Sequence, residues 1–140
     1  MKPATVILPL TVLSACQMSD ANEAQRGMSM NRMAVAHAAF QDMGSDEVAG
    51  TLMLSEEIAN TCDGIAVHTR VHSYMMGRVE RPAFVPDSVK RSQRDAALRS
   101  FSARHRLNGM SDGRAVCTAA RSEMRDMSFL GSTLMLGGTS

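Results

Sequence analysis

Residues 45–62 read SDEVAGTLMLSEEIANTC, and their apolar side chains recur at helical spacing. Ser45 can cap the start of such a helix, and Asp46 and Glu47 lie at the positive end of its dipole. The side chains expected on the buried side are Val48, Leu52, Ile58 and Ala59. This segment therefore predicts a helix that packs into the core.

The helical pattern resumes after Asp63-Gly64 and continues to Gly77. Two alternatives are open there, since the glycine either bends a single helix over residues 46–77 or divides it into two helices. The apolar positions that carry the pattern are Ile65, Val67, Val71, Tyr74 and Met75.

Residues 29–42 predict an earlier helix that stops at Gly44. Its packed side is expected to contain Met30, Met33, Ala34, His37 and Phe40.

Pro82 and Pro86 predict an irregular connection, because proline disfavours helix at its own position and at the residue before it. A helix is expected to begin at Asp87 or Ser88 and to end near Leu107, with Asn108-Gly109 as a left-handed cap.

Ser111 and Asp112 open the last expected helix. Its apolar stripe consists of Val116, Ala120, Met124, Met127, Leu130 and Leu134. No segment shows the strict alternation of a half-buried strand. The predicted fold is therefore all-α, a small bundle of about four to five helices stapled by one disulfide.

The amino terminus has the pattern of an export signal. After Lys2, an apolar run of about 10 residues reaches Leu13, a length typical of a signal peptide and too short to span a membrane. The sequence Leu13-Ser14-Ala15-Cys16 resembles the lipobox of bacterial lipoproteins, which implies that Cys16 is lipidated. The alternative is a hydrophobic terminus that ends in cysteine by chance.

This resemblance divides the chain into a signal peptide over residues 1–15, a tether over residues 16–27 and a single helical domain over residues 28–140. Lipid on Cys16 would hold the protein on a membrane facing the periplasm. Gln17 stands where an aspartate would favour the inner membrane in some enteric bacteria, so the outer membrane is the preferred prediction.

With Cys16 assigned to lipid, Cys62 and Cys117 are left as a pair. A bridge between them would close a loop of about 56 residues, which the chain-entropy model values on the order of 4 kcal/mol. The alternative is two buried free thiols. A redox-catalytic pair is disfavoured, because the spacing is not Cys-x-x-Cys.

The central and carboxyl-terminal segments resemble a family of small exported helical proteins of alphaproteobacteria whose function is unknown. The matching pieces are Ile58-x3-Cys62-x2-Ile65 and Cys117-x5-Glu123, followed by Ser128, Gly131 and Leu134. The resemblance covers residues 48–134 and implies a disulfide between the two cysteines. It implies no reaction.

Methionine is unusually frequent, with 13 residues in the chain. Met28, Met30, Met33 and His37 lie along one short expected helix, and clustered thioethers with a histidine suit Cu(I). The competing interpretation, which we prefer, is that methionine fills an irregular helical core. No cofactor is therefore predicted, and copper binding is the alternative function.

Other possible sites have weaker patterns. His68 and His72 are four residues apart, but Thr69 stands where a zinc hydrolase of the His-Glu-x-x-His type has its carboxylate base. Glu56, Glu57 and Glu123 would be catalytic only by coincidence of fold, and no nucleophile–base motif is present. The sequence therefore predicts no enzyme.

The helix expected over residues 87–107 is basic. A solvated surface is preferred there over binding of anionic lipid, because the cations do not share one face. They are Lys90, Arg91, Arg94, Arg99, Arg104 and Arg106.

Apart from Lys2, basic and acidic residues are equal in number, which argues against nucleic acid as a partner. The sequence thus predicts a lipid-anchored structural or interaction module of the cell envelope, with a membrane as partner and an envelope protein as a candidate second partner.

Overall fold

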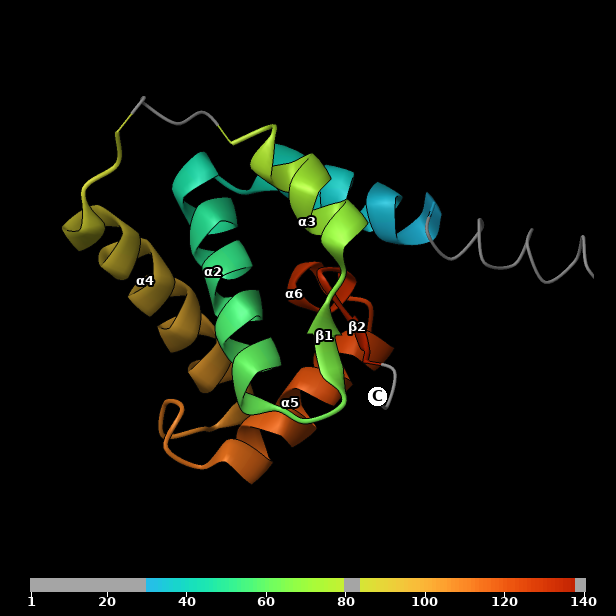
Figure 1. The fold of residues 1–140 in the computed structure, drawn as a ribbon, viewed down its shortest axis with the longest axis vertical. Coiled ribbons are helices and arrows are strands. Elements are labelled where there is room, and N and C mark those ends of the chain that lie inside the picture. The colour runs from blue at the N-terminus through green and yellow to red at the C-terminus, as the bar shows by residue number, and fades with distance from the viewer. Residues whose placement is uncertain (1–29, 80–83, 138–140) are drawn as a thin grey trace, which may run out of the picture. The chain divides into compact units, whose positions relative to one another are not determined.

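The centre of the fold is helix α2 (Ser45–Thr61) in the computed structural model, which describes residues 30–79 and 84–137. In Figure 1, α4 (Asp87–His105) lies along one side of α2, and strand β1 (Ile65–Val67) with α3 (Thr69–Met76) lies on the other. The predicted tether and signal peptide lie outside the described residues.

The remaining elements follow α4. They are α5 (Gly113–Arg125), the short α6 (Phe129–Ser132) and strand β2 (Leu134–Leu136). At the other end, the chain is helical from residue 30 to residue 42. The mainly helical fold is confirmed, with six helical segments in the described part rather than four to five.

The start of α2 differs from the prediction in its capping residue. Gly44 is the N-cap, without a side-chain cap, and Ser45 is the first helical residue. Asp46 and Glu47 stand in the first turn as predicted, where their charges favour the helix dipole. Val48, Leu52 and Ile58 are buried as expected.

Residues 46–77 form two helices, and the segment between them is a strand. The helical interpretation of Ile65 and Val67 was wrong, because β1 pairs antiparallel with β2 in the register Ile65 to Leu136 and Val67 to Leu134. Gly64, at φ 76°, turns the chain out of α2 into this strand. Two backbone bonds extend the ladder, from Gly137 N to Gly64 O at 2.9 Å and from His68 N to Thr133 O at 2.7 Å.

The last predicted helix is interrupted. α5 ends at Arg125, Met127 adopts φ 50°, and the expected continuation of the stripe to Leu134 was wrong because Leu134 lies in β2. The chain folds back so closely that a Cβ on Gly131 would lie 1.9 Å from the Glu123 carbonyl oxygen. Only glycine fits this approach of α6 to α5.

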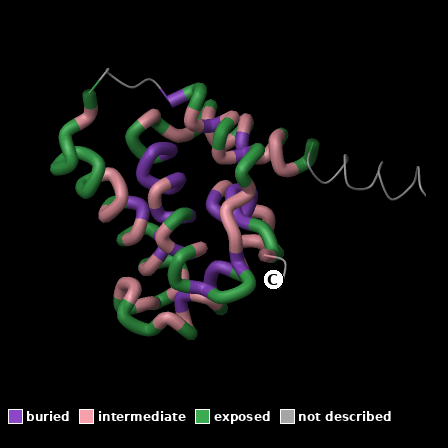
Figure 2. The backbone as a smooth tube through the Cα atoms, viewed as in Figure 1, coloured by how far each residue is buried: buried purple, intermediate pink, exposed green. Residues whose placement is uncertain are grey.

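Helix α4 begins at Asp87, as predicted, after Pro86 as its N-cap. Its left-handed cap is Arg106 at φ 54°, not the expected Asn108-Gly109, although Gly109 also has a positive φ of 67°. Only Ala97 and Phe101 are buried along this helix, so most of its surface is exposed in Figure 2.

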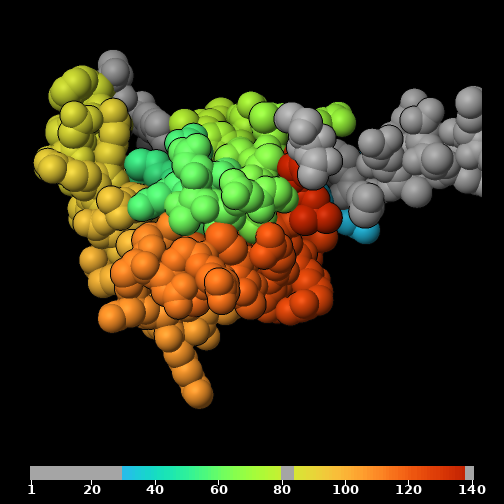
Figure 3. Space-filling view, turned by 60° about the horizontal axis from the view of Figure 1, so that its bottom comes forward, coloured from blue at the N-terminus to red at the C-terminus, as the bar shows by residue number. Residues whose placement is uncertain are grey.

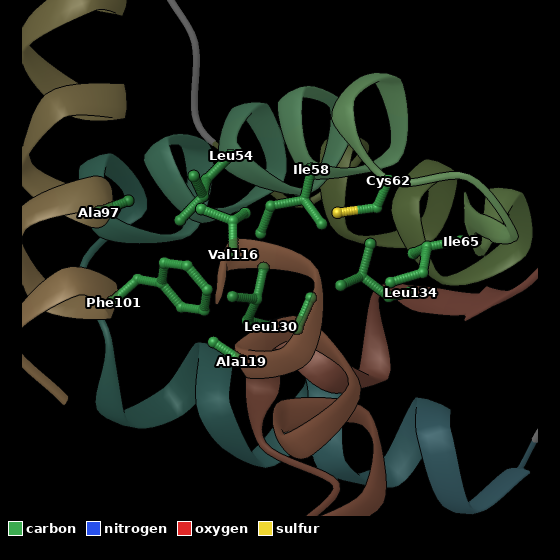
Figure 4. Packing of buried hydrophobic residues seen from close by; sticks show 11 residues of the cluster. Leu54, Ile58, Cys62, Ile65, Ala97, Phe101, Val116, Ala119, Leu130 and Leu134 are labelled. Carbon is green, nitrogen blue, oxygen red and sulfur yellow. The ribbon is translucent and has the colours of Figure 1, made fainter. Parts of the chain in front are cut away.

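Two hydrophobic clusters share α2. The first contains Phe101, whose ring points toward Leu54, Val116 and Leu130 in Figure 4. The second contains Val48 and Leu52 from α2, Ala36 from the 30–42 segment, and Val71 and Met75 from α3. Because its buried side chains belong to both clusters, α2 joins them.

Helices α2 and α4 touch through Gly50. A Cβ at this position would lie 2.2 Å from the Gln93 carbonyl oxygen, so the backbones approach more closely than an alanine would permit. This contact sets the separation of α2 and α4 at Gln93.

The Cys62–Cys117 disulfide is present and joins the end of α2 to α5, with the two Cα atoms 5.5 Å apart. Cys62 is buried in the first cluster. The bond indicates an oxidising, extracytoplasmic compartment, as the sequence predicts. Within residues 30–79 and 84–137, no helix has the length and apolar character needed to cross a membrane.

The double variant Cys62→Ala/Cys117→Ala should lower the free energy of unfolding by about 4 kcal/mol, because the unfolded chain loses a cross-link that spans 55 positions. Urea denaturation of the oxidised protein measures the difference. Reductant should reproduce the loss in the wild type and leave the variant unchanged. A loss below about 1 kcal/mol would contradict the structural role of the bond.

Candidate functional site

The most concentrated polar cluster of the described residues surrounds the Glu123 carboxylate. Glu123 lies on the inner face of α5 and is only 4% exposed. Arg104, near the end of α4, donates from Nε and Nη2 to Glu123 Oε1 over 3.1 and 3.0 Å. The neighbouring His105 places Nε2 2.6 Å from the same oxygen.

The second carboxylate oxygen of Glu123 accepts a hydrogen bond from the Ser128 hydroxyl. That hydroxyl also accepts from Gly131 N at 3.0 Å and thereby caps α6. Ser128 N in turn donates to the Glu123 carbonyl at 3.1 Å. One buried acid thus connects α4, α5 and α6.

The pKa of Glu123 is held below its usual range. Burial alone raises this pKa, but the hydrogen bonds from Ser128, His105 and Arg104 and the positive charge of Arg104 outweigh it. The carboxylate is therefore ionised at neutral pH and serves as the internal counterion of Arg104.

The arrangement does not correspond to a nucleophile and its base. Ser128 and His105 both bind the Glu123 carboxylate, on different oxygens, whereas in a catalytic triad the histidine contacts the serine. The contacts of the cluster join α4, α5 and the start of α6, and the partners of Glu123 could not be foreseen from the sequence. The Arg104 and His105 side chains stand 19 and 18 positions earlier, without a local pattern that links them to Glu123.

A pocket of about 640 Å³ lies beside this cluster, between α2, α4 and α6. Buried Leu54, Ala97 and Leu130 form its floor, and the exposed Asp46 and Glu47 stand at its rim. Figure 3 shows the first turns of α4, in yellow, projecting beyond the green surface of α2 and α3. This pocket could not be predicted from a sequence motif, because it arises from the spacing of helices.

Three of the four residues of the copper hypothesis lie in the part of the chain that the structure describes. Met28 lies outside the described residues, and Met30 is 71% exposed. Met33 packs against the second hydrophobic cluster. His37 lies 3.4 Å from Gln41 through Nε2 and 3.4 Å from the Tyr74 hydroxyl through Nδ1.

The predicted histidine pair has separate roles. His68 caps α3, its Nδ1 accepting from Val71 N at 3.4 Å. Burial, followed by the positive charge of Arg32, lowers the pKa of His68 and favours the neutral acceptor form. His72 Nε2 lies 3.1 Å from Glu56 Oε1, though not at a hydrogen-bonding angle.

Arg32 reaches from the 30–42 segment to the carboxyl-terminal elements. Its Nη1 donates to the Leu134 carbonyl at 2.6 Å and to the Gly131 carbonyl at 3.2 Å. Burial lowers the pKa of Arg32. The sequence pattern gave no indication of this contact, since the two segments are about 100 positions apart.

Of the other residues that the sequence pattern singled out, Cys62 and Cys117 form the predicted bond, whereas Cys16 lies outside the described residues. Glu57 pairs with Arg94 at 3.4 Å. Among the described residues, no group of three or more His, Cys, Asp or Glu side chains is placed to hold a metal ion. Comparison of the chain with protein families, with curated protein sequences and with solved structures finds no match.

Replacing Glu123 by glutamine should lower the free energy of unfolding at pH 7 by about 1.5–3 kcal/mol, because charge-assisted hydrogen bonds become neutral ones. The folded-state pKa of Glu123 lies below its unfolded value, so its contribution is present above the unfolded pKa. It disappears as the pH falls through the folded pKa. The gap between wild type and Glu123→Gln should therefore close in acid.

Urea denaturation of both proteins from pH 7 down to about pH 3 measures this gap. Glu56→Gln is the matched control, because that side chain is 55% exposed, and its effect should stay within about 0.5 kcal/mol. A gap between wild type and Glu123→Gln that does not change with pH would contradict the assignment.

Proposed function

We propose that the chain is a non-catalytic interaction module of the bacterial cell envelope, held at a membrane by lipid on Cys16. The observation that carries this proposal is the Cys62–Cys117 disulfide, which lies partly within the core of the domain. Disulfides of this structural kind form and persist where the environment is oxidising, outside the cytoplasm.

The anchor rests on the sequence alone, because Leu13-Ser14-Ala15-Cys16 lies outside the described residues. Two or more acyl chains hold a protein stably on a bilayer, at about 0.8 kcal/mol for each buried methylene. Gln17 after the cysteine favours the outer membrane, with the domain facing the periplasm. The polar residues 17–27 would then serve as the tether.

The non-catalytic part of the proposal is supported by how the polar side chains are used. The Glu123 carboxylate takes part in four hydrogen bonds within the domain, two with Arg104 and one each with His105 and Ser128. All four hold helices together. A cluster whose groups are committed to one another is poorly suited to abstracting a proton from a substrate. The surface that the domain offers to a partner is chiefly the exposed length of α4.

The variant Cys16→Ser should lose incorporation of radiolabelled palmitate and should leave the membrane fraction without detergent, because it lacks the acylated thiol. Fractionation of cells that express each protein measures both properties. Cys62→Ser/Cys117→Ser is the matched control, since it removes two other cysteines and should keep label and membrane. Membrane retention of Cys16→Ser would reject the anchor.

A photo-crosslinking residue at Val89 on α4 or at Leu136 on β2 should form a specific adduct with an envelope protein in intact cells. These apolar side chains are 42% and 67% exposed, and an interaction module must bring exposed surface against its partner. Electrophoresis and mass spectrometry identify the adduct. If every exposed position tested gives no adduct, the interaction module is rejected.

A further inference from the structure

We propose that the pocket between α2, α4 and α6 binds a cationic amphiphile, a small molecule with an extended apolar body and a positively charged amine or ammonium head. This binding activity goes beyond the proposed envelope module and does not depend on lipid at Cys16. The evidence is the lining of the pocket and the balance of charge around it.

The floor of the pocket is apolar and already formed. Leu54, Ala97 and Leu130 are buried side chains of the first hydrophobic cluster, with exposed fractions of 1%, 9% and 3%. Its volume of about 640 Å³ lies in the range of small-molecule sites, which characteristically combine an apolar lining with a few polar groups. An apolar body would be held there by the exclusion of water.

The wall formed by α4 leaves an elongated space. Ser92, Ala96 and Ser100 follow one another at intervals of four residues on the same side of α4, and all three line the pocket. Eight residues of helix cover about 12 Å, so small side chains border the pocket over that length. This length accommodates the extended apolar chain of such a ligand.

The charge of the pocket favours a cation. Its charged lining residues are Asp46, Glu47 and Arg104. Arg104 pairs with Glu123, and its Nη1 donates to Ser100 Oγ at 2.8 Å, so three of its five N–H donors are directed within the protein. A ligand in the pocket therefore meets the field of the two carboxylates.

Those two carboxylates have no cation of their own in the part of the chain that the structure describes. Asp46 accepts one neutral hydrogen bond, from Gln93 Nε2 at 2.7 Å, and no ion pair involves Asp46 or Glu47 among these residues. A positively charged head at the rim would gain Coulomb attraction and remain hydrated. A carboxylate or sulfate head would be repelled by the same two groups.

Isothermal titration of the oxidised full chain, carrying Cys16→Ser to remove the lipid, tests the proposal with three probes of equal chain length. They are decyltrimethylammonium and decanoate, each below its micelle concentration, and decanol below its solubility limit. The ammonium probe should bind one to one and at least about tenfold more tightly than decanoate. Equal binding of the three probes, or stronger binding of decanol or decanoate, overturns the proposal.

Two variants locate the binding. Ala96→Phe places a ring in the pocket and should abolish binding, whereas Ala103→Phe puts the same ring on an exposed position of α4 outside the pocket. Asp46→Asn/Glu47→Gln should weaken binding of the ammonium probe by about threefold to tenfold and leave decanol unchanged.

Glu56→Gln/Asp63→Asn removes the same charge at exposed positions elsewhere and should have no effect. Circular dichroism shows whether Ala96→Phe remains folded. If it does not, the rim variant alone decides, because its exposed substitutions spare the core. Unchanged ammonium binding in that variant overturns the proposal.

Discussion

The covalent bond between Cys62 and Cys117 is the constraint around which the other elements are arranged. It joins the end of α2 to the middle of α5 while α2 supplies side chains to both hydrophobic clusters. Because β1 begins at Ile65, just after the bridge, the bond also fixes where the chain can meet β2. The carboxyl-terminal elements then fold back over α5 within a short distance of α2.

Glu123 places a buried charge, where apolar side chains would otherwise pack, at the point where α4, α5 and α6 meet. Its carboxylate is balanced by Arg104 and satisfied by Ser128 and His105, so the cost of burying the ion is offset by directed bonds. Such bonds are geometrically selective, which favours one orientation of α4 over α5. The same pairing offsets the charge of Arg104 beside the adjacent pocket, whose rim carries Asp46 and Glu47.

The parts of the fold that could be predicted from the sequence are those with local causes. The helices at residues 45–61 and 87–105 follow from apolar spacing and prolines close by in the chain. The two strands could not be predicted this way, because Ile65 and Leu136 become strand residues only by pairing across about 70 positions. The bonds of Glu123 and the pocket could not be predicted either, because they depend on how the helices are spaced. The pairing of the cysteines could be predicted only because the chain has few thiols.

Arg32 gives the domain a way to carry mechanical load. If lipid holds the amino terminus, any force between the membrane and a partner enters the fold through the 30–42 segment. The bonds from Arg32 to the carbonyls of Gly131 and Leu134 couple this segment to β2, which is itself paired with β1 beside the disulfide. Tension between the membrane and a partner bound at β2 would thus pass through the disulfide and bypass the residues between Cys62 and Cys117.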